Sequence, residues 1–234
     1  YASNSAEVGW WGQGWGLPFT MCLEQLDLGE RIDFIDVFGR RIHFPRVAPG
    51  RSFYSPYEQI TLARTPQGVY RLVSGDGSHV EFAHAAGARL LCTSIADNNG
   101  NTHWLDYAAT QPDDAPPEPS HILTSGGHAL RLVFESFGQH NGQPARRLVR
   151  VDHLRGASFH ESNPLSDALG ELASAAHREA QLRGLAQERN TDFDALCAAE
   201  VLVRYDYNES GDLIRVADGT GQMLREFAWA HHML

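Results

Sequence analysis

The chain has 234 residues, of which 42% are hydrophobic and 10% aromatic, which allows one large domain or two small ones and does not suit disorder. Its 29 acidic and 19 basic residues give a formal net charge of -10, which repels phosphate backbones and argues against nucleic acid as a partner. No apolar run reaches the roughly 18 residues of a membrane span, and the first residues do not resemble a signal peptide. Because it starts at Tyr1 rather than Met, the chain is expected to be processed or excised.

Tryptophans cluster near the start of the sequence. The segment Val8–Phe19 holds three of the five tryptophans, Trp10, Trp11 and Trp15, among four glycines. A glycine-rich backbone bends sharply around large flat side chains, so this segment is expected to be a buried plug or an anchor at a strand edge. Stacking of the rings on sugars is the alternative interpretation.

Strand patterns follow up to about residue 110. Apolar and polar residues alternate, as expected of half-buried strands, in seven runs: Met21–Leu28, Arg31–Val37, Arg41–Val47, Gln59–Ala63, Val69–Val73, His79–Phe82 and Arg89–Ile95. Between them, the Gly- and Asn-containing segments Asp36–Gly39, Ser74–Gly77 and Asp97–Asn101 predict hairpin turns, because these residues tolerate positive φ.

The second half is more varied. Four prolines in Gln111–Pro119 predict an extended connection. The runs His128–Phe137 and Ala145–His153 predict a two-stranded hairpin. A helix is expected to begin at Asn163-Pro164 and to run through Leu182, and a second short helix is predicted over Asp192–Val201.

The turns share a degenerate repeat. An Asp or Asn precedes a Gly, and an aromatic residue follows four to six positions after that Gly: Gly39 leads to Phe44, Gly77 to Phe82, Gly100 to Trp104 and Gly221 to Phe227. Asp76 and Asp97 stand 21 residues apart. A repeat of this length indicates stacked hairpins, since one hairpin cannot bury its apolar face alone.

One repeat resembles a known family. The pattern Tyr205-Asp206-Tyr207-Asn208-x-x-Gly211-x-Leu213-x-x-Val216-x-Asp218-x-x-Gly221 is similar to the YD repeat of bacterial Rhs proteins. Upstream, Gly14–Phe19, Asp36–Phe44 and Asp97–Trp104 resemble the region in which those proteins enter their repeats. The Pro-rich connection (residues 111–120) and the helical insert (residues 163–200) fit the pattern poorly. Two family landmarks, the PAAR spike domain and the self-cleavage motif, are absent, so the resemblance implies an early wall segment.

The resemblance implies an all-β fold of antiparallel hairpins that form part of a spiralling, hollow β-shell. In this reading residues 1–110 are a Trp/Gly-rich opening segment with the first hairpins, 111–120 a connection, 121–162 a hairpin, 163–200 a helical insert and 201–234 a YD repeat. The residues expected to carry the repeat are Trp10, Trp11, Trp15, Asp36, Gly39, Phe44, Asp76, Gly77, Phe82, Asp97, Gly100, Trp104, Tyr205, Asp206, Tyr207, Gly211, Leu213, Asp218 and Gly221.

The function that the resemblance implies is structural. Such a shell encloses a C-terminal toxin, often of a type VI secretion effector, so the expected partners are the remaining Rhs shell of the same polypeptide, the enclosed toxin and, as a further option, a secretion spike protein. The protein would occupy the bacterial cytoplasm before export and then be secreted or delivered into a target cell. A cell-surface module that binds carbohydrate or mediates adhesion is the alternative.

Candidate chemical groups have simpler interpretations. The pair Asp113-Asp114 lies in the proline-rich connection, where solvation is expected rather than acid–base chemistry. Asp97, Asn99 and Asn101 match the first positions of a calcium loop, but position twelve is Ala108, which favours an ordinary turn.

No catalytic residue, cofactor or metal site is assigned. The twelve histidines lack the spacing of a helical zinc site, and the cysteines Cys22, Cys92 and Cys197 are expected to be buried free thiols. Gly156–His160 lacks the second Gly of a Gly-x-Ser-x-Gly nucleophile motif. The chain is therefore predicted not to be an enzyme; a glycosidase, which needs two facing carboxylates, is the least favoured alternative.

Overall fold

A computed structural model describes residues 8–107, 118–140, 143–155 and 198–229. Almost all of this part of the chain is antiparallel β-sheet, with two short 3-10 turns, η1 (Pro18–Thr20) and η2 (Asp27–Gly29). The predicted all-β fold class is confirmed. The expected connection Gln111–Pro119 falls mostly outside the described residues, as do the helix expected from Asn163-Pro164, the pair Asp113-Asp114 and Cys197.

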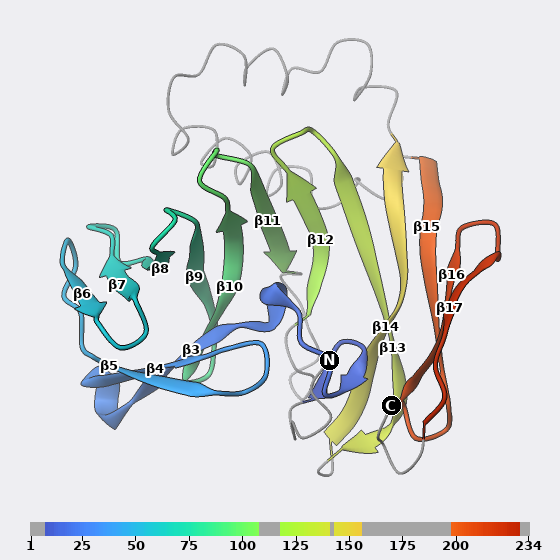
Figure 1. The fold of residues 1–234 in the computed structure, drawn as a ribbon, viewed down its shortest axis with the longest axis horizontal. Helices are drawn as coiled ribbons and strands as arrows, with labels where there is room; N and C mark the ends of the chain where they lie inside the picture. Colours follow the sequence, from blue (N-terminus) through green and yellow to red (C-terminus); the bar gives the residue numbers. More distant parts are fainter. Residues whose placement is uncertain (1–7, 108–117, 141–142, 156–197, 230–234) are drawn as a thin grey trace.

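Most strands form one long meander, in which each strand pairs antiparallel with the next along the chain (Figure 1). The strands are β6 (Ser52–Ser55), β7 (Ile60–Arg64), β8 (Tyr70–Ser74), β9 (His79–Ala86), β10 (Arg89–Ala96), β11 (Thr102–Tyr107), β12 (Pro119–Thr124), β13 (Ala129–His140), β14 (Gln143–Arg155), β15 (Ala198–Tyr207), β16 (Leu213–Asp218) and β17 (Met223–Glu226).

The sheet forks at β10. One edge of β10 pairs with β9 along its length, while its other edge pairs with β3 (Cys22–Leu26) over Arg89–Leu91 and with β11 over Ser94–Ala96. A β-bulge between Cys92 and Ser94 separates the two partners, and a bulge bends a strand and increases its twist. The branch continues through β4 (Arg31–Ile35) and β5 (Arg41–Pro45), which pair in sequence.

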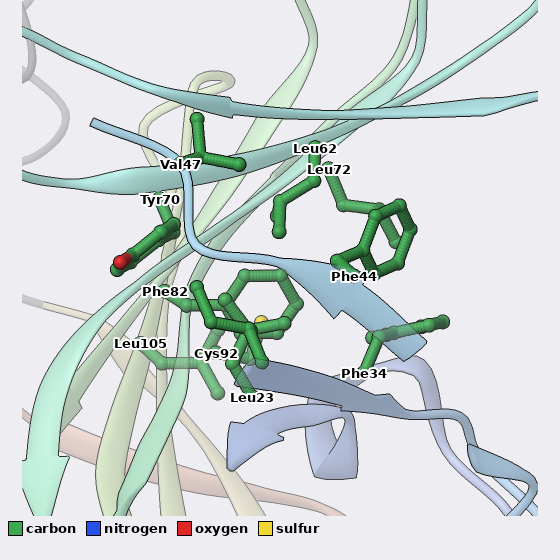
Figure 2. Close-up of a cluster of buried hydrophobic side chains, with 11 residues drawn as sticks. Leu23, Phe34, Phe44, Val47, Leu62, Tyr70, Leu72, Phe82, Cys92 and Leu105 are labelled. Atoms are coloured by element: carbon green, nitrogen blue, oxygen red, sulfur yellow. The ribbon is translucent and has the colours of Figure 1, made fainter. Parts of the chain in front are cut away.

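The fork makes β3 to β10 an incomplete ring around a hydrophobic core. The order around the ring is β5-β4-β3-β10-β9-β8-β7-β6, and it is not closed by strand pairing between β5 and β6. Figure 2 shows the side chains that fill it, packed between the β3–β5 branch and the meander. The buried members of this first cluster are Leu23, Ile32, Phe34, Phe44, Val47, Leu62, Tyr70, Leu72, Phe82, Cys92 and Leu105.

A second, smaller cluster lies on β12 to β14. Its buried members are Ile122, Leu132, Leu148 and Val151, and Val203 and Tyr205 of β15 pack against it. The segment Gly9–Thr20, here called the strap, also packs on this cluster; it includes part of a small hairpin formed by β1 (Val8–Gly9) and β2 (Gly12–Gln13). Large aromatic side chains thus cover a sheet face that would otherwise expose its apolar residues.

Seven hairpin turns share one five-residue geometry. In each, the N–H of the first residue donates to the carbonyl of the fifth, the N–H of the fourth donates to the carbonyl of the first, and the fourth residue is a glycine with φ between 78° and 94°. The first residues are Asp36, Thr65, Ser74, Asp97, Thr124, Asn208 and Asp218. Side-chain oxygens at six of these positions accept N–H groups within the turn. The glycine is needed because other residues rarely adopt this φ.

The predicted helix over Asp192–Val201 is wrong for residues 198–201, the part of this range that the structure describes. Residues Ala198 to Val201 belong to β15, and Ala198, Ala199 and Glu200 pair with Arg155, Leu154 and His153 of β14. Alanine and glutamate favour helix locally, but hydrogen bonding to a neighbouring strand outweighs that weak preference. Strand β12 begins at Pro119, inside the range expected for the proline-rich connection.

Candidate assembly site: the strap and the open sheet edges

The strap joins parts of the sheet that are far apart in sequence. The Trp10 ring stacks on Phe19 at 6.1 Å between centroids and meets Phe134 of β13 edge-on at 5.4 Å. Trp10 and Phe19 pack against both hydrophobic clusters. The strap therefore spans the boundary between the ring of β3 to β10 and the strands from β12 onward (Figure 1).

A backbone hydrogen bond holds the strap at an irregularity of β14. The register of β14 against β13 shifts between Arg150 and Leu148. Beside this bulge the Leu148 N–H donates to the Trp10 carbonyl at 2.9 Å, and the Tyr207 hydroxyl donates to the Leu148 carbonyl at 2.6 Å. Burial raises the pKa of Tyr207, so its hydroxyl keeps the proton that it donates.

The fork at β10 repeats this arrangement. The Tyr107 hydroxyl donates to the carbonyl of Cys92 at 2.8 Å, where the bulge of β10 begins. Tyr107 follows Asp106 as Tyr207 follows Asp206, and a register shift lies between the two residues of each pair. Sequence reasoning missed Tyr107; the shared Asp-Tyr at the end of both strands is the signal that could have found it.

A buried arginine marks the point where the strap, the β13–β14 hairpin and the YD repeat meet. The Arg147 Nε donates to the Gly211 carbonyl at 3.0 Å. A Cβ placed on Gly12 would lie 2.9 Å from the same carbonyl oxygen, so only glycine permits this approach. Burial lowers the pKa of the Arg147 guanidinium, against the charge of Asp212.

The other two tryptophans of the strap contact the C-terminal strands. Trp11 lies 5.4 Å from the Tyr205 ring, and Trp15 lies 5.3 Å from Phe227 and 6.5 Å from Trp229. The Trp229 indole donates to the Leu213 carbonyl. Trp10, Trp11 and Trp15 are half-buried rather than fully buried, and their contacts are with aromatic side chains of the same chain.

Three strands of the large sheet have one strand partner each among the described residues: β6 and β17 end the meander, and β5 ends the branch. All four residues of β17 are exposed, including Met223 at 53% and Leu224 at 58%. Phe53 and Tyr54 of β6 are also exposed, and Tyr57, just beyond it, is 96% exposed. An open strand edge with apolar side chains is a template for pairing with another strand.

The expected repeat residues are distributed along the whole sheet. Phe44 and Phe82 lie in the first cluster, whereas Trp104 is buried but belongs to neither cluster. Gly39, Gly77, Gly100, Gly211 and Gly221 all occupy the fourth position of the shared turn. Asp36, Asp97 and Asp218 occupy its first position, while Asp76 is the third residue of its turn and accepts the Ser78 N–H.

Other expected residues have structural contacts. Leu213 is buried at the start of β16, and Asp206 faces Arg215 across the β15–β16 pair at 3.9 Å. Cys22 and Cys92 are buried free thiols, and burial raises the pKa of Cys92 to about 12. Within the described ranges no three His, Cys, Asp or Glu side chains are placed to hold a metal ion together.

The chain resembles segments of bacterial toxins. It is 26% identical over 281 aligned positions to "Toxin protein Tse5" of Pseudomonas aeruginosa, and 24% identical over 238 to "Double-stranded DNA deaminase toxin A" of Burkholderia cenocepacia. Each alignment covers the whole chain but only 17% and 13% of the respective relative. No protein-family model matches the sequence.

The relatives are thus large toxin proteins, and the chain corresponds to less than a fifth of either. No helix in the part of the chain that the structure describes could serve as a membrane span.

Removing the Tyr207 hydroxyl tests the bond at the β14 bulge. We expect Tyr207→Phe to lower the free energy of unfolding by about 1 kcal/mol, because the buried Leu148 carbonyl loses its hydroxyl donor. Tyr107→Phe should behave alike at the fork, while Tyr57→Phe, in an exposed side chain, should change nothing measurable. Urea unfolding of the three variants measures this; equal stability of all three would contradict the role of the hydroxyls.

Proposed function

We propose that the chain is a non-catalytic wall segment of an Rhs-type shell that encloses a toxin domain of the same polypeptide for delivery into target cells. The observation that carries the proposal is the pair of open edges, β6 and β17, at the two ends of a covered antiparallel meander. A meander of this kind extends by adding hairpins, each of which pairs with the edge left by the one before it.

The exposed apolar residues support this reading. Large exposed hydrophobic side chains gather at the two ends of the sheet, at Phe53, Tyr54 and Tyr57 near β6 and at Met223 and Leu224 on β17. Elsewhere Phe38 and Leu202 are exposed. Side chains of this kind at an edge are explained if further strands cover them.

The incomplete ring also supports a sheet that continues into further strands. A sealed barrel of β3 to β10 would be a self-contained domain, but the ring lacks strand pairing between β5 and β6, and the meander leaves it at β10. The ring therefore reads as the start of a wall whose later strands continue beyond β17. The relatives have room for such a wall and for a toxin domain, because more than four fifths of each lies outside the match.

Further partners and the route of export follow from the shell. We propose that the rest of the shell pairs with the β17 edge, that the toxin lies inside, and that the complete polypeptide passes from the bacterial cytoplasm to the outside of the producing cell. A secretion spike protein is an additional partner in this scheme.

Two leucines provide a matched test. Leu224 lies on β17 and Leu202 lies within the sheet on β15, and they are 58% and 42% exposed. In the 234-residue chain, Leu224→Lys and Leu202→Lys should each change the unfolding free energy by less than about 0.5 kcal/mol, because surface substitutions cost little.

In the complete polypeptide, Leu224→Lys should speed protease release of the toxin domain at least about tenfold, since side chains of the added strand would lie beside the lysine on the same face of the sheet and remove water from its charge. Leu202→Lys should increase the rate of toxin release less than Leu224→Lys does. If both variants release the toxin at the wild-type rate, no strand covers β17 and the shell proposal is wrong.

A further inference from the structure

We infer that the strap couples the two halves of the sheet and fixes the position of the β17 edge. The first half is the ring of β3 to β10 with β11, and the second half runs from β12 to β17. Strand pairing between β11 and β12 links them, but each half has its own hydrophobic cluster.

Two strap residues are common to both clusters. Among the described residues, Trp10 and Phe19 are the side chains that pack against the first cluster and also against the second. They stack on each other at 6.1 Å, and Phe19 meets His103 of β11 at 6.1 Å. Because burial of apolar surface is the main source of cohesion, this shared pair makes folding of one half favour folding of the other.

The ring contacts of Trp15, in the middle of the strap, reach the end of the second half, whereas the backbone of the next residue, Gly16, lies against Val37 and Phe38 of the first half. Trp15 contacts Phe227 and Trp229, which directly follow β17. Strand β17 itself has every residue exposed and pairs with β16, so its side chains contribute little burial of their own. Trp15 therefore holds the end of β17 against the sheet and keeps the β16–β17 hairpin in place, which is the condition for an edge to receive another strand.

The close approach of Gly12 to Gly211 fixes where the strap crosses. A Cβ on Gly12 would meet the Gly211 carbonyl oxygen at 2.9 Å, and Gly12 itself has φ of 106°. The Arg147 Nε donates to the same carbonyl and would lie 3.7 Å from that Cβ. This point lies between Trp10 and Trp15 in sequence, and Trp15 lies between the two coupling residues Trp10 and Phe19.

The test compares Trp10→Ala and Trp15→Ala, with Tyr57→Ala as the exposed aromatic control. The measurements are urea unfolding and amide hydrogen exchange read by mass spectrometry. Wild type and Tyr57→Ala should unfold in one transition. Trp10→Ala should unfold in two transitions, because the shared side chain is lost. Amide exchange in β12 to β17 should rise at a lower urea concentration than amide exchange in β7 to β10.

Trp15→Ala should act locally. Exchange at the amides of Met223–Glu226 should rise at least tenfold while β7 to β10 keep wild-type protection. If Trp10→Ala does not fold, Trp10→Phe replaces it, and the same split transition is expected from its smaller ring. A single transition with uniform loss of protection for the Trp10 variant would overturn the coupling, and unchanged exchange in β17 for Trp15→Ala would overturn the control of the edge.

Discussion

Gly219→Ala is expected to destabilise the chain by about 3 kcal/mol or more, within the range of severe backbone and packing defects. Gly219 lies in the turn between β16 and β17, where a Cβ would overlap the carbonyl oxygen of Val201 and stand 2.8 Å from its carbonyl carbon. Both atoms belong to the backbone of β15, which cannot rotate away as a flexible side chain would. The turn must therefore move from β15. Urea unfolding monitored by tryptophan fluorescence measures the loss.

A matched glycine controls for the turn itself. Gly75 occupies the second position of the turn that starts at Ser74, as Gly219 does in the turn that starts at Asp218. A Cβ on Gly75 would meet nothing within 4 Å. We expect Gly75→Ala to be neutral or to stabilise by up to about 1 kcal/mol, through reduced freedom of the unfolded chain. Equal losses at both positions would show that the turn, and not the approach to β15, disfavours alanine.

Asp33 is the second position where a large effect is expected. Its side chain is 2% exposed and lies on β4 among Arg31, Arg41 and His43. The His43 Nδ1 lies 2.7 Å from one carboxylate oxygen, and Arg41 lies 3.4 Å from the other. We expect Asp33→Asn to cost about 2–3 kcal/mol at pH 7, as for hydrogen bonds to a charged group. Asp27→Asn, at a side chain 68% exposed and 3.8 Å from Arg31, should cost under about 1 kcal/mol.

The same substitution should change the acid limb of stability. Burial raises the pKa of Asp33, but the hydrogen bonds from His43 and Arg41 outweigh it, and the pKa lies below the ordinary 3.8. A carboxyl whose folded pKa is depressed stabilises the fold above its unfolded pKa, and this stabilisation disappears as pH falls through the folded value. The difference between wild type and Asp33→Asn should therefore shrink below about pH 4. Thermal unfolding from pH 7 to pH 2 checks this; a constant difference would contradict it.

Residue patterns predict the strands that have one covered face. The run Arg41–Val47 alternates because Phe44 points into the first cluster while Arg41 and His43 face the ion pairs of Asp33. No alternating run is predicted over β6, and β17 is indicated only by the spacing from Gly221 to Phe227, for the opposite reason: Phe53 and Tyr54 are both exposed, and so are all residues of β17. In β11, Trp104 and Leu105 are both buried. Alternation is lost wherever both faces of a strand are exposed or both faces are covered.

The candidate site was predictable only in part. The density of tryptophan and glycine indicated an anchor, and the Tyr-Asp-Tyr motif marked the C-terminal hairpin. Nothing local in the sequence indicated that Trp10 would meet Tyr207 and Leu148, because such contacts depend on how the intervening strands pair. The fork at β10 is equally non-local, since the partner of Leu91 is Cys22. The Asp-Tyr pairs at the ends of β11 and β15 were readable, but their meaning needed the bulges beside them.

The shared five-residue turn has a consequence for how such chains vary in length. Each of these turns closes through its own polar residue and glycine, without help from distant strands. Insertion of two strands between such turns preserves the up-and-down direction of everything that follows, whereas insertion of one strand reverses it. Homologous chains should therefore lengthen or shorten by whole hairpins, and the gaps in the 281-position alignment with the Pseudomonas protein should fall between strands in multiples of that unit.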